Sequence, residues 1–226
     1  MAINDVSLTS GMRSNLLSLQ GTVDLLNRTQ SRLSTGKKVN SAIDNPVSFF
    51  ASQALNSRAS VIDSLKDAMG QAVQTITAAD KGIKAITAMI EQAKGIAQSA
   101  QSATPQSAEM TSLQGQYNAL RTQLSAIATD SGYKGKNLLD ADTLAVKFEG
   151  ATLSVAGFNA SADGLLISAA DWAAADPTAA IDADVVKLDT ALVTLRQESS
   201  KMSGNLSIIT VRQDFSTNMI NTLTEG

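Results

Sequence analysis

The sequence predicts a mainly helical protein: an elongated antiparallel rod of long, coiled-coil-like helices with a small β-hairpin insertion. Apolar residues recur at steps of three and four over long stretches, a spacing typical of helices that pack along a seam. Aromatic residues make up only 4% of the 226 residues, which favours narrow seams over a thick globular core. Each proline follows a residue that can cap a helix, at Asn45-Pro46, Thr104-Pro105 and Asp176-Pro177, and so predicts a helix start.

The first predicted helix runs from about Ser7 to Leu33. Gln30 is the one polar interruption of its heptad stripe. The stripe consists of Met12, Leu16, Leu19, Val23, Leu26 and Leu33. Gly36 and its polar neighbours then stop the helix and open a connecting segment over residues 34–40, where we expect a hinge or spoke. We therefore divide the chain into an N-terminal core helix and spoke segment, residues 1–46, and a helical rod domain, residues 47–226.

The second predicted helix carries the longest stripe. Its apolar positions are Ile62, Leu65, Met69, Ala72, Ile76, Ala79, Ile83, Ile86, Ile90, Ala93, Ala97 and Ala100. We expect these side chains to be buried within the chain itself, because a stripe of this length usually covers its own seam first. Its flanks carry the charged pairs Asp63 with Lys66, Asp80 with Lys84 and Glu91 with Lys94, which predict a solvated face.

Two more helices complete the predicted rod. After Thr104-Pro105 the stripe resumes with Met110, Leu113, Tyr117, Leu120, Leu124 and Ile127, and the short connection predicts an antiparallel hairpin with the second helix. The C-terminal rod helix, residues 177–226, repeats the pattern at Val185, Leu188, Leu192, Leu195, Met202, Leu206 and Ile209. It must pack on the hairpin to hide its seam.

An insertion over residues 140–176 separates the third helix from the fourth. Leu144, Val146 and Phe148 alternate with polar residues, and Leu153 and Val155 do the same after a Gly150 turn, which predicts a β-hairpin. The stretch that follows is rich in Ala, Gly and Asp, and we expect surface variation there.

The composition excludes several classes of function. The chain has no histidine and no cysteine, so the commonest acid–base catalyst, the commonest nucleophile and the main zinc ligands are absent. We expect no enzyme, no catalytic residue, no cofactor and no metal; Asp182 with Asp184, and Asp140 with Asp142, are interpreted as capping or solvated carboxylates. A net charge of −3 without a basic stripe argues against nucleic-acid binding. No apolar run is long enough for membrane insertion, and the start at Met1 lacks the pattern of a secretory signal.

Three segments of the sequence carry recognisable motifs. The stretch from Leu33 to Pro46, Leu-Ser-Thr-Gly-Lys-Lys-Val-Asn-Ser-Ala-Ile-Asp-Asn-Pro, is similar to the amino-terminal signature of bacterial flagellins. Residues 132–140 resemble the family's Phe-Asn-Gly-x-x-Leu-Leu turn, with Tyr133 and Lys134 in place of the Phe-Asn pair. Residues 205–223 are similar to the carboxy-terminal half of alphaproteobacterial flagellins.

The resemblance implies a structural subunit of the bacterial flagellar filament, secreted and extracellular, which self-assembles through helical packing for motility. It implies type III export through the flagellar machinery, a cytoplasmic chaperone, hook-associated proteins and other flagellin subunits as partners. Filament-core packing is then expected of Leu16, Leu19, Val23, Leu26 and Leu33. Packing of the rod is expected of Ile62, Leu65, Met69, Ile76, Ile83, Ile86, Ile90, Leu192, Leu195, Leu206 and Ile209.

Two departures from the family pattern lead to further expectations. Flagellins continue past the position of Gly226 into a last amphipathic helix that pairs with the first helix. We therefore expect a truncated form that cannot assemble normally, with its first forty or so residues mobile unless a partner or a crystal neighbour covers them. An innate immune receptor reads many flagellins through an arginine in a motif aligned with residues 89–98, where this chain has Glu91. The reversed charge predicts weak or absent receptor activation.

The same long antiparallel hairpins also suit a hook–filament junction protein, a secretion-system tip protein or a signalling coiled coil. The signature from Gly36 to Pro46 separates flagellins best from these alternatives, because junction proteins share the terminal pattern but less of the two inner motifs.

Overall fold

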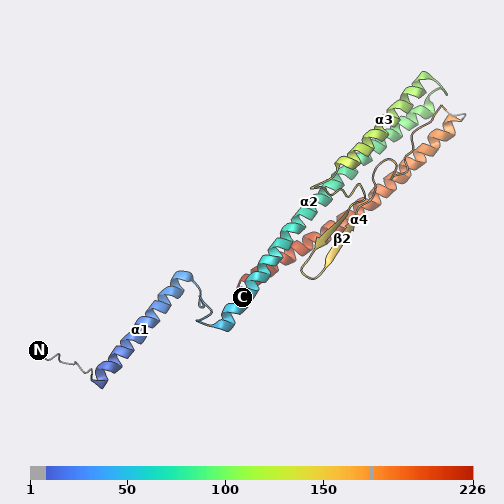
Figure 1. Ribbon diagram of the computed structural model, residues 1–226. Coiled ribbons are helices and arrows are strands. Elements are labelled where there is room, and N and C mark those ends of the chain that lie inside the picture. The colour runs from blue at the N-terminus through green and yellow to red at the C-terminus, as the bar shows by residue number, and fades with distance from the viewer. Residues whose placement is uncertain (1–8, 174–175, 226) are drawn as a thin grey trace. The chain divides into compact units, whose positions relative to one another are not determined.

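The computed structural model describes residues 9–173 and 176–225. The described chain contains α1 (Ser10–Thr35), α2 (Pro46–Ser102), α3 (Ala108–Asp130), β1 (Thr143–Lys147), β2 (Thr152–Ala156) and α4 (Pro177–Glu225), as Figure 1 shows. Two compact units divide it: unit 1 holds the residues up to Arg58 and those from Leu223 on, and unit 2 runs from Ala59 to Thr222. The predicted mainly helical class with a small two-stranded insertion is confirmed.

Two of the three proline-marked helix starts are confirmed. Asn45 Oδ1 accepts a hydrogen bond from the Ser48 N–H at 3.1 Å, and α2 begins at Pro46. Asp176 Oδ1 accepts from the Ala179 N–H at 3.1 Å, and α4 begins at Pro177. In both cases proline takes the first helical position, where its missing N–H costs nothing.

The predicted start at Thr104-Pro105 is wrong. Helix α3 begins at Ala108, and Ser107 caps it by accepting a hydrogen bond from the Met110 N–H at 3.1 Å. Pro105 instead lies in a tight turn, because the Ser107 N–H donates to the Thr104 carbonyl at 3.1 Å and Gln106 takes a positive φ of 58°. A left-handed residue directly after the proline is incompatible with a helix that starts there.

Helix α1 ends close to the predicted position. It runs to Thr35, and Gly36 follows it with a φ of 66°, the left-handed conformation that glycine adopts at helix ends. The predicted start at Ser7 lies outside the described residues. So do residues 1–6, the segment in which the sequence lacks the pattern of a secretory signal.

Unit 2 is built on α2 and α4, which run antiparallel beside each other with α3 alongside (Figure 1). Polar contacts join α2 to α4 along this seam, and residue numbers rise on α2 as they fall on α4. These α2–α4 contacts pair Lys66 with Gln213, Asp80 with Ser199, Lys94 with Asp189 and Gln101 with Asp182. The predicted antiparallel packing of the C-terminal helix is therefore observed.

The insertion consists of a β-hairpin and a packed segment. Strands β1 and β2 pair antiparallel, from Thr143 opposite Ala156 to Lys147 opposite Thr152, and each buries one valine, Val146 and Val155. Residues 157–173, which we call the strap, follow β2. The strap is not a surface loop, because it buries Ala160, Ala162, Leu165, Ile167, Ala170 and Trp172. Surface variation there stays a prediction, restricted to the exposed positions.

None of the helices in the described part of the chain is both long enough and apolar enough to cross a membrane.

Candidate assembly surfaces

Helix α1 presents an apolar stripe that the described chain does not cover. The five residues expected in a filament core remain between 48% and 84% exposed, and no residue of α1 is buried. They are Leu16, Leu19, Val23, Leu26 and Leu33. An amphipathic helix that buries nothing is marginal by itself in water. Its apolar face is therefore available to another chain.

The segment after α1 is a turn closed by Asp44. Its Oδ2 atom accepts hydrogen bonds from the Asn40 N–H at 3.2 Å, from the Ser41 N–H at 3.2 Å and from the Ser41 hydroxyl at 3.3 Å. The Asn40 N–H is the largest cause of a lowered pKa at Asp44, because a carboxylate that accepts several hydrogen bonds is stabilised in its charged form. The signature from Asn40 to Pro46 is thus a turn that connects α1 to the capped start of α2.

The residues expected to hold the rod together lie in the core of unit 2. Leu65 and Leu206 are half-buried. The other nine are buried: Ile62, Met69, Ile76, Ile83, Ile86, Ile90, Leu192, Leu195 and Ile209. This burial agrees with the expectation that the α2 stripe is covered by other residues of the same chain. The buried positions are therefore unavailable to a neighbouring subunit.

The strap is held by a ladder of hydrogen bonds from α3 to its backbone. Four polar side chains on one face of α3 each contact the strap, and residue numbers rise on α3 as they fall along the strap. The pairs are Gln114 with Trp172, Asn118 with Ala170, Arg121 with Ile167 and Ser125 with Ala162. Asn118 binds both backbone groups of its partner, accepting at 2.8 Å and donating at 3.3 Å.

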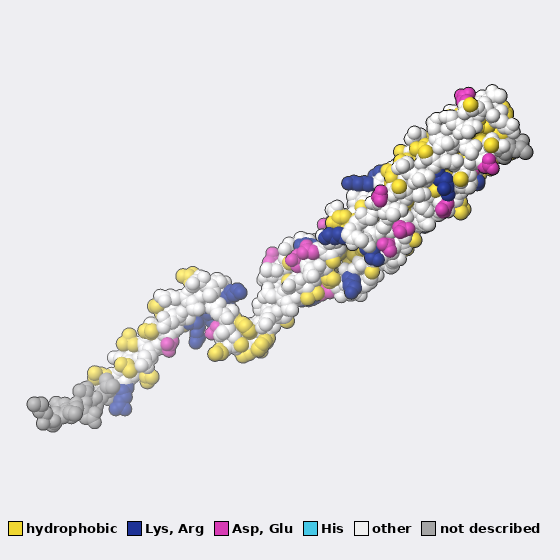
Figure 2. Space-filling view, turned by 45° about the horizontal axis from the view of Figure 1, so that its top comes forward, with side chains coloured by type: hydrophobic (Ala, Val, Ile, Leu, Met, Phe, Trp, Pro, Cys, Tyr) yellow, Lys and Arg dark blue, Asp and Glu magenta, His cyan; other side chains and the backbone are white. Residues whose placement is uncertain are grey.

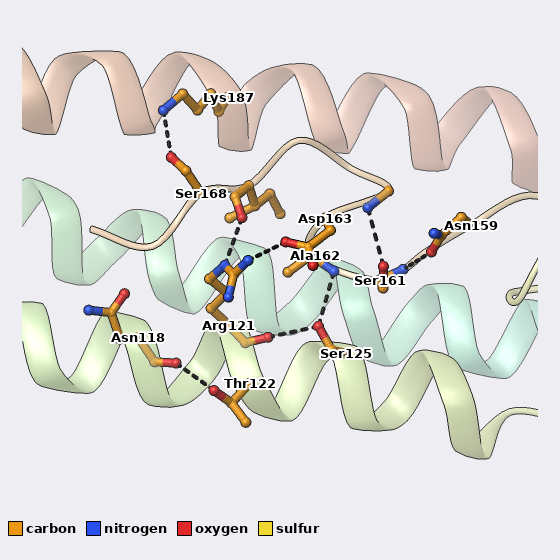
Figure 3. A network of polar contacts seen from close by, with 12 residues as sticks. Asn118, Arg121, Thr122, Ser125, Asn159, Ser161, Ala162, Asp163, Ser168 and Lys187 are labelled. Carbon is orange, nitrogen blue, oxygen red and sulfur yellow. Dashed lines mark hydrogen bonds and ion pairs between the residues drawn. The ribbon is translucent and has the colours of Figure 1, made fainter. Parts of the chain in front are cut away.

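Figure 3 shows the strap lying between α3 and α4. Arg121 of α3 also pairs with the Asp163 carboxylate. On the opposite side, Lys187 Nζ of α4 donates to the Ser168 hydroxyl at 2.6 Å. Polar side chains of both helices therefore hold the strap.

A polar cluster is buried where the strap ends. The Trp172 ring, fully buried, donates through Nε1 to Asp184 Oδ2 at 3.1 Å, and Lys187 Nζ lies 3.1 Å from the other carboxylate oxygen. With the Ser168 hydroxyl, which donates to Asp184 Oδ1 at 3.4 Å, three donors compensate the desolvation of this buried carboxylate. The Tyr117 ring packs on Trp172 at 5.3 Å between centroids, and burial raises the pKa of the Tyr117 phenol.

The inner motif at residues 132–140 forms a turn organised by Asn137. Lys134 and Gly135 both take positive φ, 48° and 76°, between the bridged residues Tyr133 and Lys136. Asn137 Nδ2 donates to the Ala128 and Thr129 carbonyls at the end of α3, at 2.8 and 2.9 Å. The motif therefore terminates α3, and the two leucines after Asn137, Leu138 and Leu139, are buried. Tyr133 and Lys134, the two residues at which the sequence departs from the resembled Phe-Asn pattern, both belong to this turn.

Glu91 is exposed on α2. The predicted pairs of Lys66 with Asp63 at 2.8 Å and Lys84 with Asp80 at 2.6 Å are confirmed. The predicted pair of Glu91 with Lys94 is not formed, because Lys94 Nζ reaches across the seam to Asp189 Oδ1 at 2.6 Å. The spacing of charges within α2 could not predict this pair, because Asp189 belongs to a different helix.

Nowhere among the described residues do three or more acidic side chains come together in a way that could hold a metal ion. Asp184 is bound by Trp172 and Lys187, and Asp142 Oδ2 accepts from the Asn137 N–H at 2.9 Å. These carboxylates organise the fold.

Comparison with known proteins identifies the family. Residues 3–143 match the bacterial flagellin N-terminal helical region. The chain belongs to the bacterial flagellin family. This flagellin is 27% identical over 223 residues to flagellin FljO of Caulobacter vibrioides, covering 95% of this chain and 82% of that protein. It is 25% identical to flagellin FljK of the same organism over 225 residues, with the same coverage.

The fold agrees with a solved flagellin. The crystal structure of Bacillus cereus flagellin superposes with a TM-score of 0.57 at 17% identity, covering 67% of this chain and 91% of that one. This flagellin is a structural subunit of the bacterial flagellar filament, the extracellular part of the flagellum.

Sequence reasoning missed the ladder on α3. Gln114, Asn118, Arg121 and Ser125 recur at steps of four and three, so the helical spacing of polar residues was a usable signal. Their partners gave no signal, because a ladder that ends on backbone groups places no demand on the side chains of the strap.

Proposed function

We propose that this flagellin assembles with further copies of itself through the exposed stripe of α1, and that it acts by packing and not by catalysis. The observation that carries the proposal is the exposure of Leu16, Leu19, Val23 and Leu26, which are 48%, 65%, 55% and 54% accessible at heptad spacing. Full burial of such a side chain contributes about 1.5–3 kcal/mol. Covering four of them supplies a substantial driving force for association.

A stripe that is satisfied only by a neighbouring copy leads to an open polymer. If the partner surface differs from the stripe, the contact is heterologous, and such contacts repeat without closing unless the rotation forms a ring. Filament growth follows from this geometry. The register in which α1 helices pack in the filament core would then set which lateral contacts unit 2 makes with neighbouring copies.

Sedimentation with filament fragments as seeds tests the proposal against the expectation that this chain cannot assemble normally. Pelletable polymer from the wild type would support the proposal, and its absence would support the expectation of blocked assembly. Leu19→Ser with Val23→Ser removes two stripe residues, and we expect pelletable polymer to fall sharply while the circular dichroism of unit 2 stays unchanged. The matched control is Leu17→Ser with Leu25→Ser, which removes two equally exposed leucines, 68% and 63% accessible, away from the heptad stripe. Equal loss in both variants would contradict a stripe-specific contact.

We infer the export route and the finer partners from family membership. A flagellin that belongs outside the cell requires passage through the flagellar export machinery, and a cytoplasmic chaperone would cover its apolar α1 stripe before export. Hook-associated proteins would cap the same surfaces at the filament ends. Co-purification of the chaperone with the wild type, but not with Leu19→Ser and Val23→Ser together, checks this assignment.

We also propose weak innate-receptor activation, because Glu91 is exposed and places a negative charge where many flagellins present arginine. A reporter-cell assay that compares the wild type with Glu91→Arg tests this. A strong wild-type response would overturn it, and an increase in the variant supports it.

A further inference from the structure

A groove of about 350 Å³ lies on unit 2 between α2, the turn after α3, and β1. Its lining includes the apolar side chains of Leu65, Ala68, Ala72, Leu144, Ala145 and Val146, and the uncharged polar ones of Ser64, Gln71, Thr75 and Tyr133. Three lysines also line it: Lys134, Lys136 and Lys147. The groove therefore combines an apolar part, which we call its floor, with three lysines, which we call its rim, and we call it the basic groove.

The basic rim is poorly compensated by the chain's own carboxylates. Lys136 Nζ lies 3.9 Å from Asp142 Oδ1, a long ion pair. Within the described residues, no ion pair involves Lys134 or Lys147. Asp67, although on the same stretch of α2, lines a different groove beside Gln213. The groove accordingly attracts negative charge.

The far end of unit 2 has the opposite charge. The sequence contains no lysine or arginine between Lys94 and Arg121, or between Lys147 and Lys187. These stretches expose Glu109, Asp171, Asp176 and Asp182. They meet where α2 turns into α3, since Gln101 binds Asp182 and Gln114 binds the Trp172 backbone. Magenta side chains mark this acidic end in Figure 2.

We propose that the basic groove docks the acidic end of a second copy of this chain. The proposal rests on the proposed function and names a second contact by which copies associate. Charge complementarity selects the partner, and the acidic end carries small exposed side chains, Thr104 and Ala108 among them, that fit an apolar floor. The acidic end would need no large aromatic side chain to contact the floor of the groove.

One molecule cannot satisfy this contact by itself. Thr75, the last α2 residue of the groove, and Ser102, at the end of α2, are separated by roughly 40 Å at 1.5 Å per residue. The two surfaces lie on the same rigid helix, so they meet only between copies. A contact between two different surfaces repeats from copy to copy, in the same open manner as the α1 contact.

Charge reversal tests the docking. One variant combines Lys134→Glu, Lys136→Glu and Lys147→Glu, and a second combines Glu109→Lys, Asp171→Lys and Asp182→Lys, which makes the acidic end net basic while Asp176 still caps α4. Each variant alone opposes like charges in every contact, and we expect seeded polymer to fall about tenfold or more. An equimolar mixture offers complementary surfaces in alternating order, and we expect it to recover most of the wild-type yield. Wild-type polymerisation by either variant, or no recovery in the mixture of folded variants, would overturn the docking.

Cross-linking separates this docking from filament formation itself. The chain has no cysteine, so Ala145→Cys in the groove and Thr104→Cys at the acidic end each introduce a single thiol. Mixed at high concentration without seeds, they should form a mixed dimer with a short bismaleimide, in a yield that falls with salt. Thr104→Cys mixed with Thr190→Cys, on the exposed face of α4, is the control.

The outcomes of the two experiments are distinct. Cross-linking without wild-type polymer supports the docking and counts against the filament proposal. Wild-type polymer without the specific cross-link leaves the α1 proposal standing and overturns the docking, and failure of both overturns both.

Discussion

Position 82 in the middle of α2 leaves no room for a side chain. A Cβ atom there would lie 2.5 Å from Leu139 Cδ1 and 2.8 Å from Ser131 Cβ, and Leu139 is fully buried. Glycine at this point lets the turn after α3 approach the helix closely. We predict that Gly82→Ala lowers the free energy of unfolding by about 1–3 kcal/mol, measured by urea denaturation.

Gly95→Ala is the matched control for that experiment. It lies in the same helix, on an exposed position where an added Cβ meets nothing within 4 Å. Alanine there should raise the free energy of unfolding by about 1 kcal/mol through helix propensity alone. Destabilisation of equal size at both positions would show that the crowding at Gly82 is not the cause.

Tyr117 buries a hydroxyl that has no hydrogen-bond partner among the described residues. Leaving such a group unpaired costs about 1–3 kcal/mol, so Tyr117→Phe should stabilise the protein by about 1 kcal/mol at neutral pH. The phenyl ring keeps the contact with Trp172. Urea denaturation followed by Trp172 fluorescence measures the difference, and a less stable Phe variant would contradict it.

The same tyrosine makes stability depend on alkaline pH. Burial, and next the nearby Asp184 carboxylate, raise the pKa of Tyr117 above its ordinary value of 10.0. The folded state therefore holds the proton more tightly than the unfolded state, and its stability contribution is present below pH 10 and is lost above it. Wild type should lose more stability than Tyr117→Phe above pH 10, and parallel curves would refute this.

At the scale of elements, the ladder from α3 is the device that orders the strap. Asn118→Leu removes both bonds to Ala170 and leaves its backbone N–H and C=O unpaired, which should cost about 1–3 kcal/mol. Amide hydrogen exchange should speed up in the strap before it does in α2. Gln123→Leu, on an exposed face of α3, is the control and should leave exchange in the strap unchanged.

Sequence periodicity predicted the helices well, because the α2 stripe from Ile62 to Ala100 and the caps at Asn45 and Asp176 are local signals that tertiary packing reinforces. It failed at Thr104-Pro105, where a turn closed by the Ser107 N–H on the Thr104 carbonyl, with Gln106 at positive φ, replaced the expected start. It also failed for the strap, whose order comes from bonds made by residues more than thirty positions away, such as Ser125 with Ala162. Long-range polar contacts leave no period in the sequence.

The sequence predicted the heptad spacing of the α1 stripe, but it did not predict that the stripe would be exposed. A heptad pattern indicates that a helix will be covered, and it does not indicate which chain covers it. The basic groove was invisible in the sequence, because it joins residues of α2, the turn after α3, and β1. Only the clustering of lysines at positions 134–147 hinted at it.

At the scale of the whole molecule, the two units should differ in stability. Since α1 buries no residue, removal of residues 1–35 should leave the Tm of unit 2 unchanged within about 2 °C. Leu195→Ala, which empties a fully buried site, should cost about 2–5 kcal/mol and lower the Tm by several degrees. Calorimetry of both variants beside the wild type checks the prediction, and a large shift on removal of α1 would contradict it.

The α2–α4 contacts have a mechanical consequence. They lie one after another along two antiparallel helices, from Lys66 with Gln213 to Gln101 with Asp182. A force along the helix axes loads all of them in shear at once, whereas a force that separates one helix end loads them one at a time. A propeller that transmits torque along its length benefits from the first geometry, since many weak ties then share the load and none must be strong alone.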